Sequence, residues 1–244
     1  MIDCCIAISS TIFPRDARDS SIVKSVYSGD QRLAQTQATV ASLRALGYSS
    51  IYLFDNSGGE HRNALDRAFP GVRVKVFDHY QYDNKGISET FLLLEALRDL
   101  PEDRQIIKIS GRYQLAKRLE FDADRYDLAA RIYQHEPLHF RRRETMATRC
   151  YSFRNKAVYR AYLLALLEEM YAYSSRIVGF GSLRRFLINQ FFSNRNAYSF
   201  MDPSLSVEAA SINVMRNLKL RLFRLESIGL AGFAGTFQSL LIED

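Results

Sequence analysis

Four short polar stretches stand out because their side chains could bind phosphate, sugar or base groups. They are Ser9-Ser10-Thr11, Asp55-Asn56-Ser57, Asn84-Lys85-Gly86 and Ser110-Gly111-Arg112-Tyr113. A lysine beside a glycine at the start of a helix suits phosphate, because backbone N–H groups and a positive charge converge there. An aspartate at the end of a strand can accept a hydrogen bond from a ribose hydroxyl or a base N–H. We predict that the four stretches share one crevice.

Each stretch taken alone also has an ordinary structural explanation. Lys85 could be a solvated lysine in a turn that Gly86 permits, and Asp55 and Asn56 favour turns by bonding their own backbone. The P-loop spacing GxxxxGKS/T is absent, and so is the GxGxxG of dinucleotide-binding proteins. The hypothesis of a shared crevice therefore depends on where the surrounding elements place the four stretches.

Apolar runs typical of strands alternate with helical patterns in the first half of the chain. We predict strands over 4–9, 50–54, 72–77 and 105–110, and helices over 30–46, 61–69 and 86–100. This alternation indicates βαβ units and a largely parallel sheet, in which ligands bind at the carboxyl ends of the strands. Three of the polar stretches follow predicted strands, and the fourth leads from a strand into a helix. We therefore expect all four at one edge of the sheet.

The second half of the chain has a different pattern. We predict strands over 128–134 and 148–153, helices over 156–173 and 183–192, and a mixed basic and apolar end over 215–244. No repeat, low-complexity linker or domain boundary is visible. The sequence therefore predicts one α/β domain over 1–244, with a Rossmann-like, mostly parallel central sheet and a helical C-terminal elaboration.

Composition narrows the range of partners. The 244 residues carry a net charge of +6, which suits a nucleotide, a phospholipid surface or a nucleic acid. The cysteines, Cys4, Cys5 and Cys150, are odd in number and form no CxxC pair, which indicates a reduced, cytosolic protein. No apolar run reaches the roughly 18 residues of a membrane span. We expect no signal peptide, because the N-terminus lacks a basic region.

Three further motifs invite a chemical interpretation, and each has a competing one. His135-Glu136-Pro137-Leu138-His139 matches the zinc-protease string HExxH, but Pro137 opposes the helix that this metal site needs. Asp122 and Asp124 resemble the DxD pair that holds a divalent metal, although a solvated turn explains them as well. Arg141-Arg142-Arg143 could face solvent, an anion or anionic lipid, and no RNA-binding module accompanies it.

The order of the motifs resembles a group of bacterial sugar transferases of the GT-A type, which build O-antigen or capsule polysaccharides. The similar segments are QRLAQTQATVASLRALG, IYLFDNSGG, NKGISETFLLLEAL and IIKISGRYQL, within residues 3–117, with a weaker echo over 202–211. In that group a Gly-Arg-Tyr element, here Gly111-Arg112-Tyr113, stands where other GT-A enzymes place the DxD. The resemblance implies a single GT-A-like domain with a donor-binding half, 1–117, and an acceptor-binding half, 118–244.

The resemblance also implies roles for particular residues. Those expected to bind the nucleotide-sugar donor are Ser9, Ser10, Asp55, Asn56, Lys85, Gly86, Ser110, Gly111, Arg112 and Tyr113. Arg112 would neutralise the departing phosphates with its planar fork, in the place of a metal ion. No cofactor would then be required, with Mg²⁺ or Mn²⁺ at Asp122 and Asp124 as the alternative.

The acceptor side of such a reaction also needs particular groups. An inverting transfer requires a base for the acceptor hydroxyl, for which Glu208 is the first candidate and Glu136 the second, although an isolated glutamate is usually a surface residue. The expected acceptor is a glycan or lipid-linked glycan, and the expected location is the cytoplasm, peripheral to the inner membrane. The apolar stripe Leu218, Leu220, Leu222 and Leu225 could rest on anionic membrane, or form a core strand or a partner-binding edge.

Two other functions compete with glycosyl transfer. A nucleotidyl- or phosphotransferase could use the same crevice and would need metal-binding carboxylates, for which Asp122 and Asp124 are the close pair. A basic nucleic-acid-binding protein would show salt-dependent affinity for oligonucleotides and no turnover of nucleotide-sugars. We favour the glycosyltransferase and expect no nucleic-acid partner.

Overall fold

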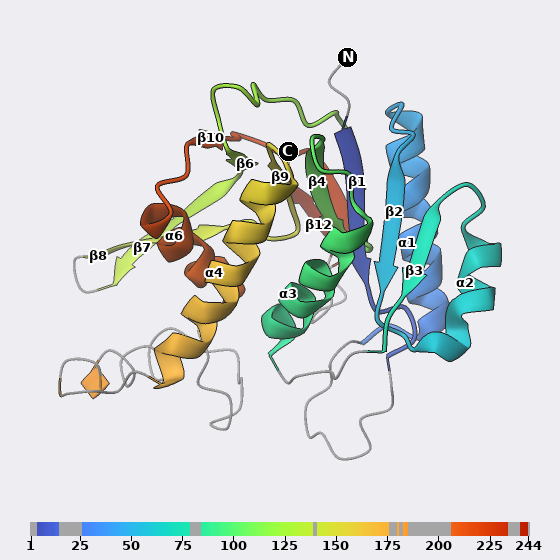
Figure 1. The fold of residues 1–244 in the computed structure, drawn as a ribbon, viewed down its shortest axis with the longest axis horizontal. Coiled ribbons are helices and arrows are strands. Elements are labelled where there is room, and N and C mark those ends of the chain that lie inside the picture. The colour runs from blue at the N-terminus through green and yellow to red at the C-terminus, as the bar shows by residue number, and fades with distance from the viewer. Residues whose placement is uncertain are drawn as a thin grey trace.

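A seven-stranded sheet forms the centre of the computed structural model, which describes residues 4–14, 26–78, 84–138, 141–175, 180, 183–184, 206–233 and 240–243 (Figure 1). The strands lie in the order β10-β6-β9-β4-β1-β2-β3. Their bounds are β1 Cys4–Ser10, β2 Ile51–Asp55, β3 Arg73–Val76, β4 Gln105–Ser110, β6 Leu128–Ala130, β9 Cys150–Phe153 and β10 Leu222–Arg224. Strands from both halves of the chain therefore share one sheet, while the division into donor and acceptor halves stays a prediction.

Neighbouring strands run parallel through most of this sheet. β1 pairs in parallel with β2 and β4, β2 with β3, and β10 with β6. Of the described strands in this sheet, β9 alone runs the other way, against β4 and β6. The predicted class, α/β with a mostly parallel central sheet, is confirmed. The carboxyl ends of β1, β2, β3 and β4 consequently meet at one edge.

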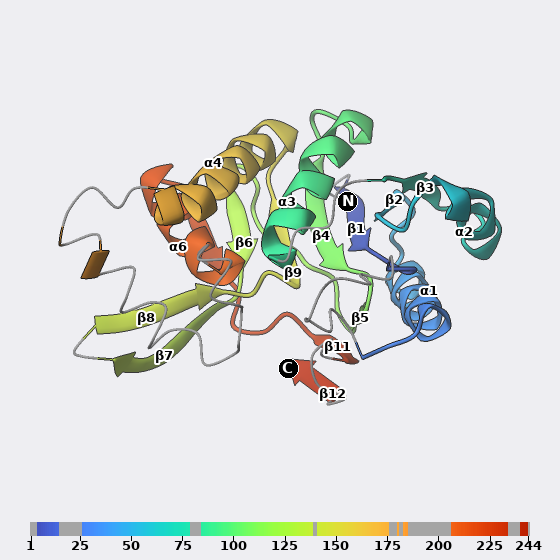
Figure 2. The ribbon, with the colours of Figure 1, turned by 90° about the horizontal axis from the view of Figure 1, so that it is seen from below.

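The two faces of the sheet bury alternate residues of the same strands, as the period of two in a strand requires. In β1, Cys5 and Ala7 face one core and Ile6 and Ile8 face another. Figure 2 shows α3, α4 and α6 on one side of the strands, and α1 with a small sheet on the other. The helices are α1 Gly29–Ala45, α2 Arg62–Ala68, α3 Lys85–Ala96, α4 Lys156–Ser175 and α6 Val207–Asn217.

Two smaller sheets complete the described fold. One has the order β12-β11-β5, and the other is the hairpin of β7 and β8. Their bounds are β5 Tyr113–Leu115, β7 Ile132–Leu138, β8 Arg141–Met146, β11 Leu230–Phe233 and β12 Leu240–Glu243. Because β5 begins just after β4 ends, the chain leaves the central sheet at Gly111 and Arg112 and joins the small sheet beneath it.

Side-chain caps fix the first turns of the two helices that begin at the carboxyl edge of the sheet. Ser28 and Gln31 form a capping box at the start of α1. Asn84 caps α3, and its side-chain oxygen accepts hydrogen bonds from the backbone N–H groups of Gly86, at 2.8 Å, and Ile87, at 3.2 Å. Residues in the first two turns of α1 and α3 are thereby held next to the ends of β1, β2 and β4.

The observed elements depart from the predicted ones in several places. The strand predicted over 128–134 is two strands, β6 and β7, and the helix predicted over 86–100 ends at Ala96 and continues as a 3-10 turn, Leu97–Asp99. The end of the chain contributes α6, β10, β11 and β12, so the C-terminal elaboration contains strands as well as helices. Lys219, with φ of +52°, turns the chain out of α6 toward β10. Most of the helix predicted over 183–192 lies outside the described residues.

The HExxH string does not form the helix of a zinc protease. His135 and Glu136 lie in β7, which pairs with β8, and the Nε2 atom of His135 lies 2.7 Å from Oγ1 of Thr145. His139 lies outside the described residues. An extended strand cannot place the two histidines one helical turn apart, as the zinc site needs. Arg141, Arg142 and Arg143 belong to β8.

The apolar stripe near the end of the chain mostly joins the core. Leu220 and Leu222 pack against the core that includes α3 and α4, and Leu225 packs against the other core. Leu218 is the exposed member, at 38%. The alternative of a core strand therefore explains most of this pattern. Among the described residues, no helix is both long and apolar enough to cross a membrane.

Gly232 in β11 is required for the close approach of β11 to the end of β4. A Cβ atom there would lie 2.3 Å from the backbone oxygen of Arg112 and 2.6 Å from Cδ1 of Tyr113. We expect Gly232→Ala to lower the free energy of unfolding by about 1–3 kcal/mol, because the backbone must shift to relieve the overlap. Urea denaturation measures this. Gly59→Ala is the matched control, since its Cβ would meet no atom within 4 Å; equal losses in both variants would contradict the assignment.

Candidate functional site

A cavity of about 190 Å³ opens at the carboxyl edge of the central sheet, between the first turns of α1 and α3. It brings together most of the residues that the sequence predicts for the crevice: Ser9, Ser10, Thr11, Asn56, Lys85, Ser110, Gly111 and Arg112. Residues that the sequence reasoning did not include also line it: Ile12, Pro14, Arg32, Thr36, Ser88, Glu89 and Leu92. The cavity is smaller than the roughly 300–1,000 Å³ of typical ligand pockets. It has room for the phosphate groups of a ligand, and the remainder would extend outside.

Asp55 supports the cavity from below rather than lining it. Its side chain is fully buried and accepts a hydrogen bond from the Ser10 hydroxyl. It also accepts from the backbone N–H groups of Ile12 and Ser57, both at 2.9 Å. These bonds use both carboxylate oxygens, so Asp55 fixes the loop after β1 against the end of β2. Of the predicted pair, Asn56 is the residue that reaches the cavity.

Two more of the predicted residues lie away from the cavity wall. A Cβ atom on Gly86 would lie 2.8 Å from Cβ of Val207, so this glycine allows α3 to approach α6. Tyr113 is 3% exposed in β5, and the guanidinium of Arg149 lies 5.8 Å from its ring centroid. Gly111, by contrast, lines the cavity where a Cβ would lie 3.0 Å from Oγ1 of Thr36.

Two arginines from different elements face the cavity. Arg112 follows β4, and Arg32 lies in the first turn of α1. Burial and the like charge of Arg112 lower the pKa of Arg32 to about 10, although the nearby Asp55 opposes this. Within the part of the chain that the structure describes, neither guanidinium makes an ion pair or a hydrogen bond. Two unpaired cations that repel each other form a site for an anion.

A buried ion pair forms the opposite wall. Lys108, in β4, is 1% exposed, and its Nζ atom lies 2.7 Å from Oε1 of Glu89. The same ammonium donates to Oγ of Ser110 at 2.9 Å and to the backbone oxygen of Thr148 at 2.7 Å. Oε1 of Glu89 also accepts from Oγ of Ser9 at 2.5 Å. The pair therefore ties β4, α3 and β1 together beside the cavity.

Glu89 stays ionised in this setting. Burial raises the pKa of its carboxyl group. Four effects lower that pKa by more, so the net shift is downward: the charge of Lys108, the hydrogen bonds from Lys108 and Ser9, and the charge of Arg112. A carboxylate with a lowered pKa is charged at neutral pH and can only accept hydrogen bonds. Sequence reasoning missed Glu89, although it lies one helical turn after Lys85 and thus on the same face of α3.

The predicted catalytic glutamates do not line the cavity among the described residues. Glu208, in the first turn of α6, accepts a hydrogen bond from Oγ1 of Thr148 at 3.4 Å. Because the backbone oxygen of Thr148 bonds Lys108, Glu208 is one residue removed from the buried ion pair. Glu136 lies in β7, and its side chain falls outside the described residues. The role of either as a base stays a prediction.

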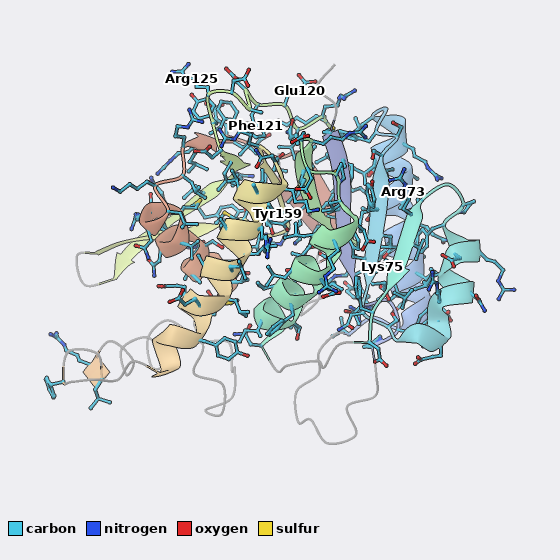
Figure 3. The ribbon with its side chains drawn as sticks, viewed as in Figure 1. Arg73, Lys75, Glu120, Phe121, Arg125 and Tyr159 are labelled. Atoms are coloured by element: carbon cyan, nitrogen blue, oxygen red, sulfur yellow. The ribbon has the colours of Figure 1, made fainter. Side chains whose placement is uncertain are left out.

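Asp122 and Asp124 lie at the wrong edge of the sheet for the cavity. They precede the amino end of β6, which runs in the same direction as β4, so they are at the edge opposite the cavity. Figure 3 shows their sequence neighbours Glu120 and Arg125 at the end of the molecule where β1 begins, with Glu120 near the start of β1 and Arg125 above β6 and β10. Asp122 closes a turn by accepting from the N–H groups of Asp124 and Arg125. Among the described residues, no group of three or more acidic, histidine or cysteine side chains could hold a metal ion.

Comparison with known proteins gives distant likenesses. Neither a protein-family model nor a curated protein sequence matches the chain. A nucleoside-diphosphate-sugar pyrophosphorylase from Vibrio cholerae has 12% identity and a TM-score of 0.48 over 90% of each chain. An active-site mutant of LgtC has 9% sequence identity and a TM-score of 0.46, and the match covers 94% of this chain and 87% of that one. A 4-diphosphocytidyl-2C-methyl-D-erythritol synthase from Anaerococcus prevotii has 11% identity and a TM-score of 0.41, and the match covers 88% of this chain and 99% of that one. At these scores, function has to be inferred from the residues of this chain.

Because Lys108 is buried in its ion pair and Lys75 is not, two lysine substitutions should differ in how much they lower the free energy of unfolding. We expect Lys108→Met to lower the free energy of unfolding by about 3 kcal/mol, the lower end for breaking a buried pair, because Glu89 keeps 28% exposure. Lys75→Met breaks an ion pair with Asp99 whose lysine is 41% exposed, and it should cost less than about 1 kcal/mol. Urea denaturation of both variants compares them, and similar losses would show that Lys108 is not the anchor of the site.

Proposed function

We propose that the protein is a glycosyltransferase that moves a sugar from a nucleotide-sugar donor to a glycan or lipid-linked glycan in surface polysaccharide synthesis. The observation that carries the proposal is the pair of guanidiniums, Arg32 and Arg112, which make no ion pair or hydrogen bond among the described residues and face a small cavity with Lys85 at the carboxyl edge of the sheet. That edge is where open α/β sheets bind their ligands. The cavity, with three cations from three elements, matches the diphosphate of such a donor.

The chemistry of glycosyl transfer gives these cations a task. When the bond between sugar and diphosphate breaks, negative charge grows on the departing phosphate oxygens. Fixed positive groups stabilise that charge without reorganising during the reaction. Arg112 and Arg32 offer planar donor forks, and Lys85 offers a point charge. We infer that these residues hold the leaving group in place of a divalent metal ion, and that the nucleoside extends past Asn56 outside the cavity.

The donor set around the cavity supports a metal-independent reaction. A hard divalent cation prefers several oxygen ligands, with carboxylates foremost. Among the described lining residues, Glu89 is the one carboxylate, and its Oε1 atom is already bonded to Lys108 and Ser9. The two guanidiniums would repel a cation. A nucleotidyltransferase, the competing function, would use the same cavity but depend on such an ion.

Binding of donor probes tests the proposal. We expect one or more of UDP-glucose, GDP-mannose, dTDP-glucose and a CMP-sugar to raise the melting temperature in EDTA, with about 2.7 kcal/mol of stabilisation at 100 times Kd. Arg112→Lys and Arg32→Lys should each weaken binding at least about tenfold, because a charge-assisted hydrogen bond contributes roughly 1.5–3 kcal/mol. Arg62→Lys, on an arginine that is 69% exposed, is the control and should bind as the wild type does.

The outcomes separate the competing functions. Binding or sugar transfer that vanishes in EDTA and returns with Mg²⁺ or Mn²⁺ would overturn metal independence. Release of pyrophosphate from a nucleoside triphosphate and a sugar phosphate would identify a nucleotidyltransferase instead. If no nucleotide or nucleotide-sugar binds to the wild type, the proposed function is wrong.

The proposed base is tested separately once a donor is known. We propose that Glu208 accepts the proton of the acceptor hydroxyl, since its hydrogen bond to Thr148 connects it to the residues around Lys108. Glu208→Gln should then lower turnover by about 100-fold or more, the usual contribution of a general base, with donor affinity unchanged. Glu168→Gln, on α4, is a control of the same chemistry. Near wild-type turnover in a folded Glu208→Gln protein would exclude Glu208 as the base.

A further inference from the structure

Glu89 is an unexpected group in a cavity that is otherwise suited to phosphate. It is the one carboxylate among the described residues that line the cavity, and the charges of Lys108 and Arg112 help to keep it ionised. A carboxylate repels phosphate oxygens and cannot donate a hydrogen bond to them. Its presence on this wall therefore needs an explanation beyond anion binding.

The two oxygens of Glu89 are used differently. Oε1 takes both described contacts, from Oγ of Ser9 at 2.5 Å and from Nζ of Lys108 at 2.7 Å. Within the described residues, Oε2 has no hydrogen-bond donor. The side chain is 28% exposed, and it lines the cavity. One oxygen thus anchors the side chain, and the other is available to a bound molecule.

The available oxygen has a restricted set of partners. An ionised carboxylate can only accept, so its ligand must supply an O–H or N–H group close to the phosphates that the arginines attract. A bare polyphosphate has no such group. A hexose attached to a phosphate through C1 carries a hydroxyl group on the adjacent carbon, and a ribose attached through C5′ carries hydroxyl groups on C3′ and C2′.

We propose that Glu89 makes the site selective for phosphates that carry a hydroxyl group beside the phosphate, by accepting that hydroxyl at Oε2. The inference rests on the proposed function and deepens it, because it concerns the part of the donor next to the diphosphate. The hydroxyl belongs either to the ribose or to the transferred sugar. Lys108 and Ser9 act as positioning residues, since they hold Oε1 and so aim Oε2 into the cavity.

Ligand pairs on the wild-type protein provide the first test, because no substitution is needed. The probes are inorganic pyrophosphate, UDP-glucose, UDP and 2′-deoxy-UDP, with the GDP-mannose series as the second set, measured by calorimetry in EDTA. If the ribose supplies the hydroxyl, loss of the 2′-hydroxyl weakens binding at least about tenfold. If the sugar supplies it, UDP-2-deoxyglucose shows the loss relative to UDP-glucose, and the deoxyribose change has little effect.

Two variants provide the second test. Glu89→Gln should weaken the hydroxyl-bearing ligand at least about tenfold while pyrophosphate binds equally well or more tightly, because a repulsive charge is removed. Glu89→Gln leaves Lys108 buried without its counter-ion and can lose stability. The double variant Glu89→Met with Lys108→Met removes the whole pair, a change that is often neutral for stability. Like Glu89→Gln, it should bind the hydroxyl-bearing ligand more weakly while pyrophosphate binding is not weakened.

The results distinguish the two proposals. Equal weakening of pyrophosphate and of the hydroxyl-bearing ligand would reduce Glu89 to a structural partner of Lys108 and overturn the inference. Unchanged binding of both would overturn it as well, and in either case the proposed function stands. Failure of every nucleotide and nucleotide-sugar to bind the wild type overturns the proposed function, and with it the inference.

Discussion

The buried ammonium of Lys108 is the constraint that the rest of the site depends on. It stands in a strand whose neighbours are Ile106, Ile107 and Ile109, all fully buried. A charge in such a position must be paired and hydrogen-bonded, or the strand could not stay in the sheet. Two of the partners that satisfy it come from elsewhere in the chain, Glu89 on α3 and the Thr148 backbone before β9, and the third is Ser110 at the tip of β4 itself. Satisfying one charge therefore fixes the geometry of one wall of the cavity.

On the other wall, two positive charges have no ion pair among the described residues. Arg32, on α1, and Arg112, after β4, both face the cavity, and burial together with the like charge of Arg112 lowers the pKa of Arg32. Glu89 lines the cavity from α3, as Lys85 does, whereas Arg32 comes from α1 and Arg112 from the tip of β4. Asp55 is close enough to oppose the shift of Arg32, but its oxygens are held by Ser10 and the backbone of the loop after β1. A ligand that bridges the two walls must itself contain both an anion and a hydrogen-bond donor.

The fold and part of the site follow from sequence patterns, and the exceptions have physical causes. Apolar runs that alternate with helical patterns place β1 to β4, and the rule that ligands bind at their carboxyl ends gathers Ser9, Asn56 and Arg112. The same rule puts Asp55 and Tyr113 in the cavity, which they do not line, because it says where a strand ends and not which way a side chain points. Tyr113 turns into the core because β5 pairs with β11, more than a hundred residues later, and no local signal announces that pairing. Arg32 and Glu89 were missed because they come from helices, whose first turns share the edge with the strand tips.

The same geometry bears on the proposal that a guanidinium takes the part of a metal ion. A divalent cation needs several oxygens that converge on one point, and Glu89, the one carboxylate among the described residues that line the cavity, already neutralises a lysine. Asp122 and Asp124 do not add to it, because they precede the amino end of β6 at the far edge of the sheet. Arginine avoids that demand, since its charge is permanent and it needs no preformed shell of ligands. With Gly111 admitting the backbone beside Thr36 and Ser10, and Gly232 admitting β11 beneath Arg112, the chain holds Arg112 at the strand tip by close packing of backbone. The backbone thus fixes the position of the charge, and the guanidinium, which has no ion pair within the described part of the chain, can face the proposed ligand.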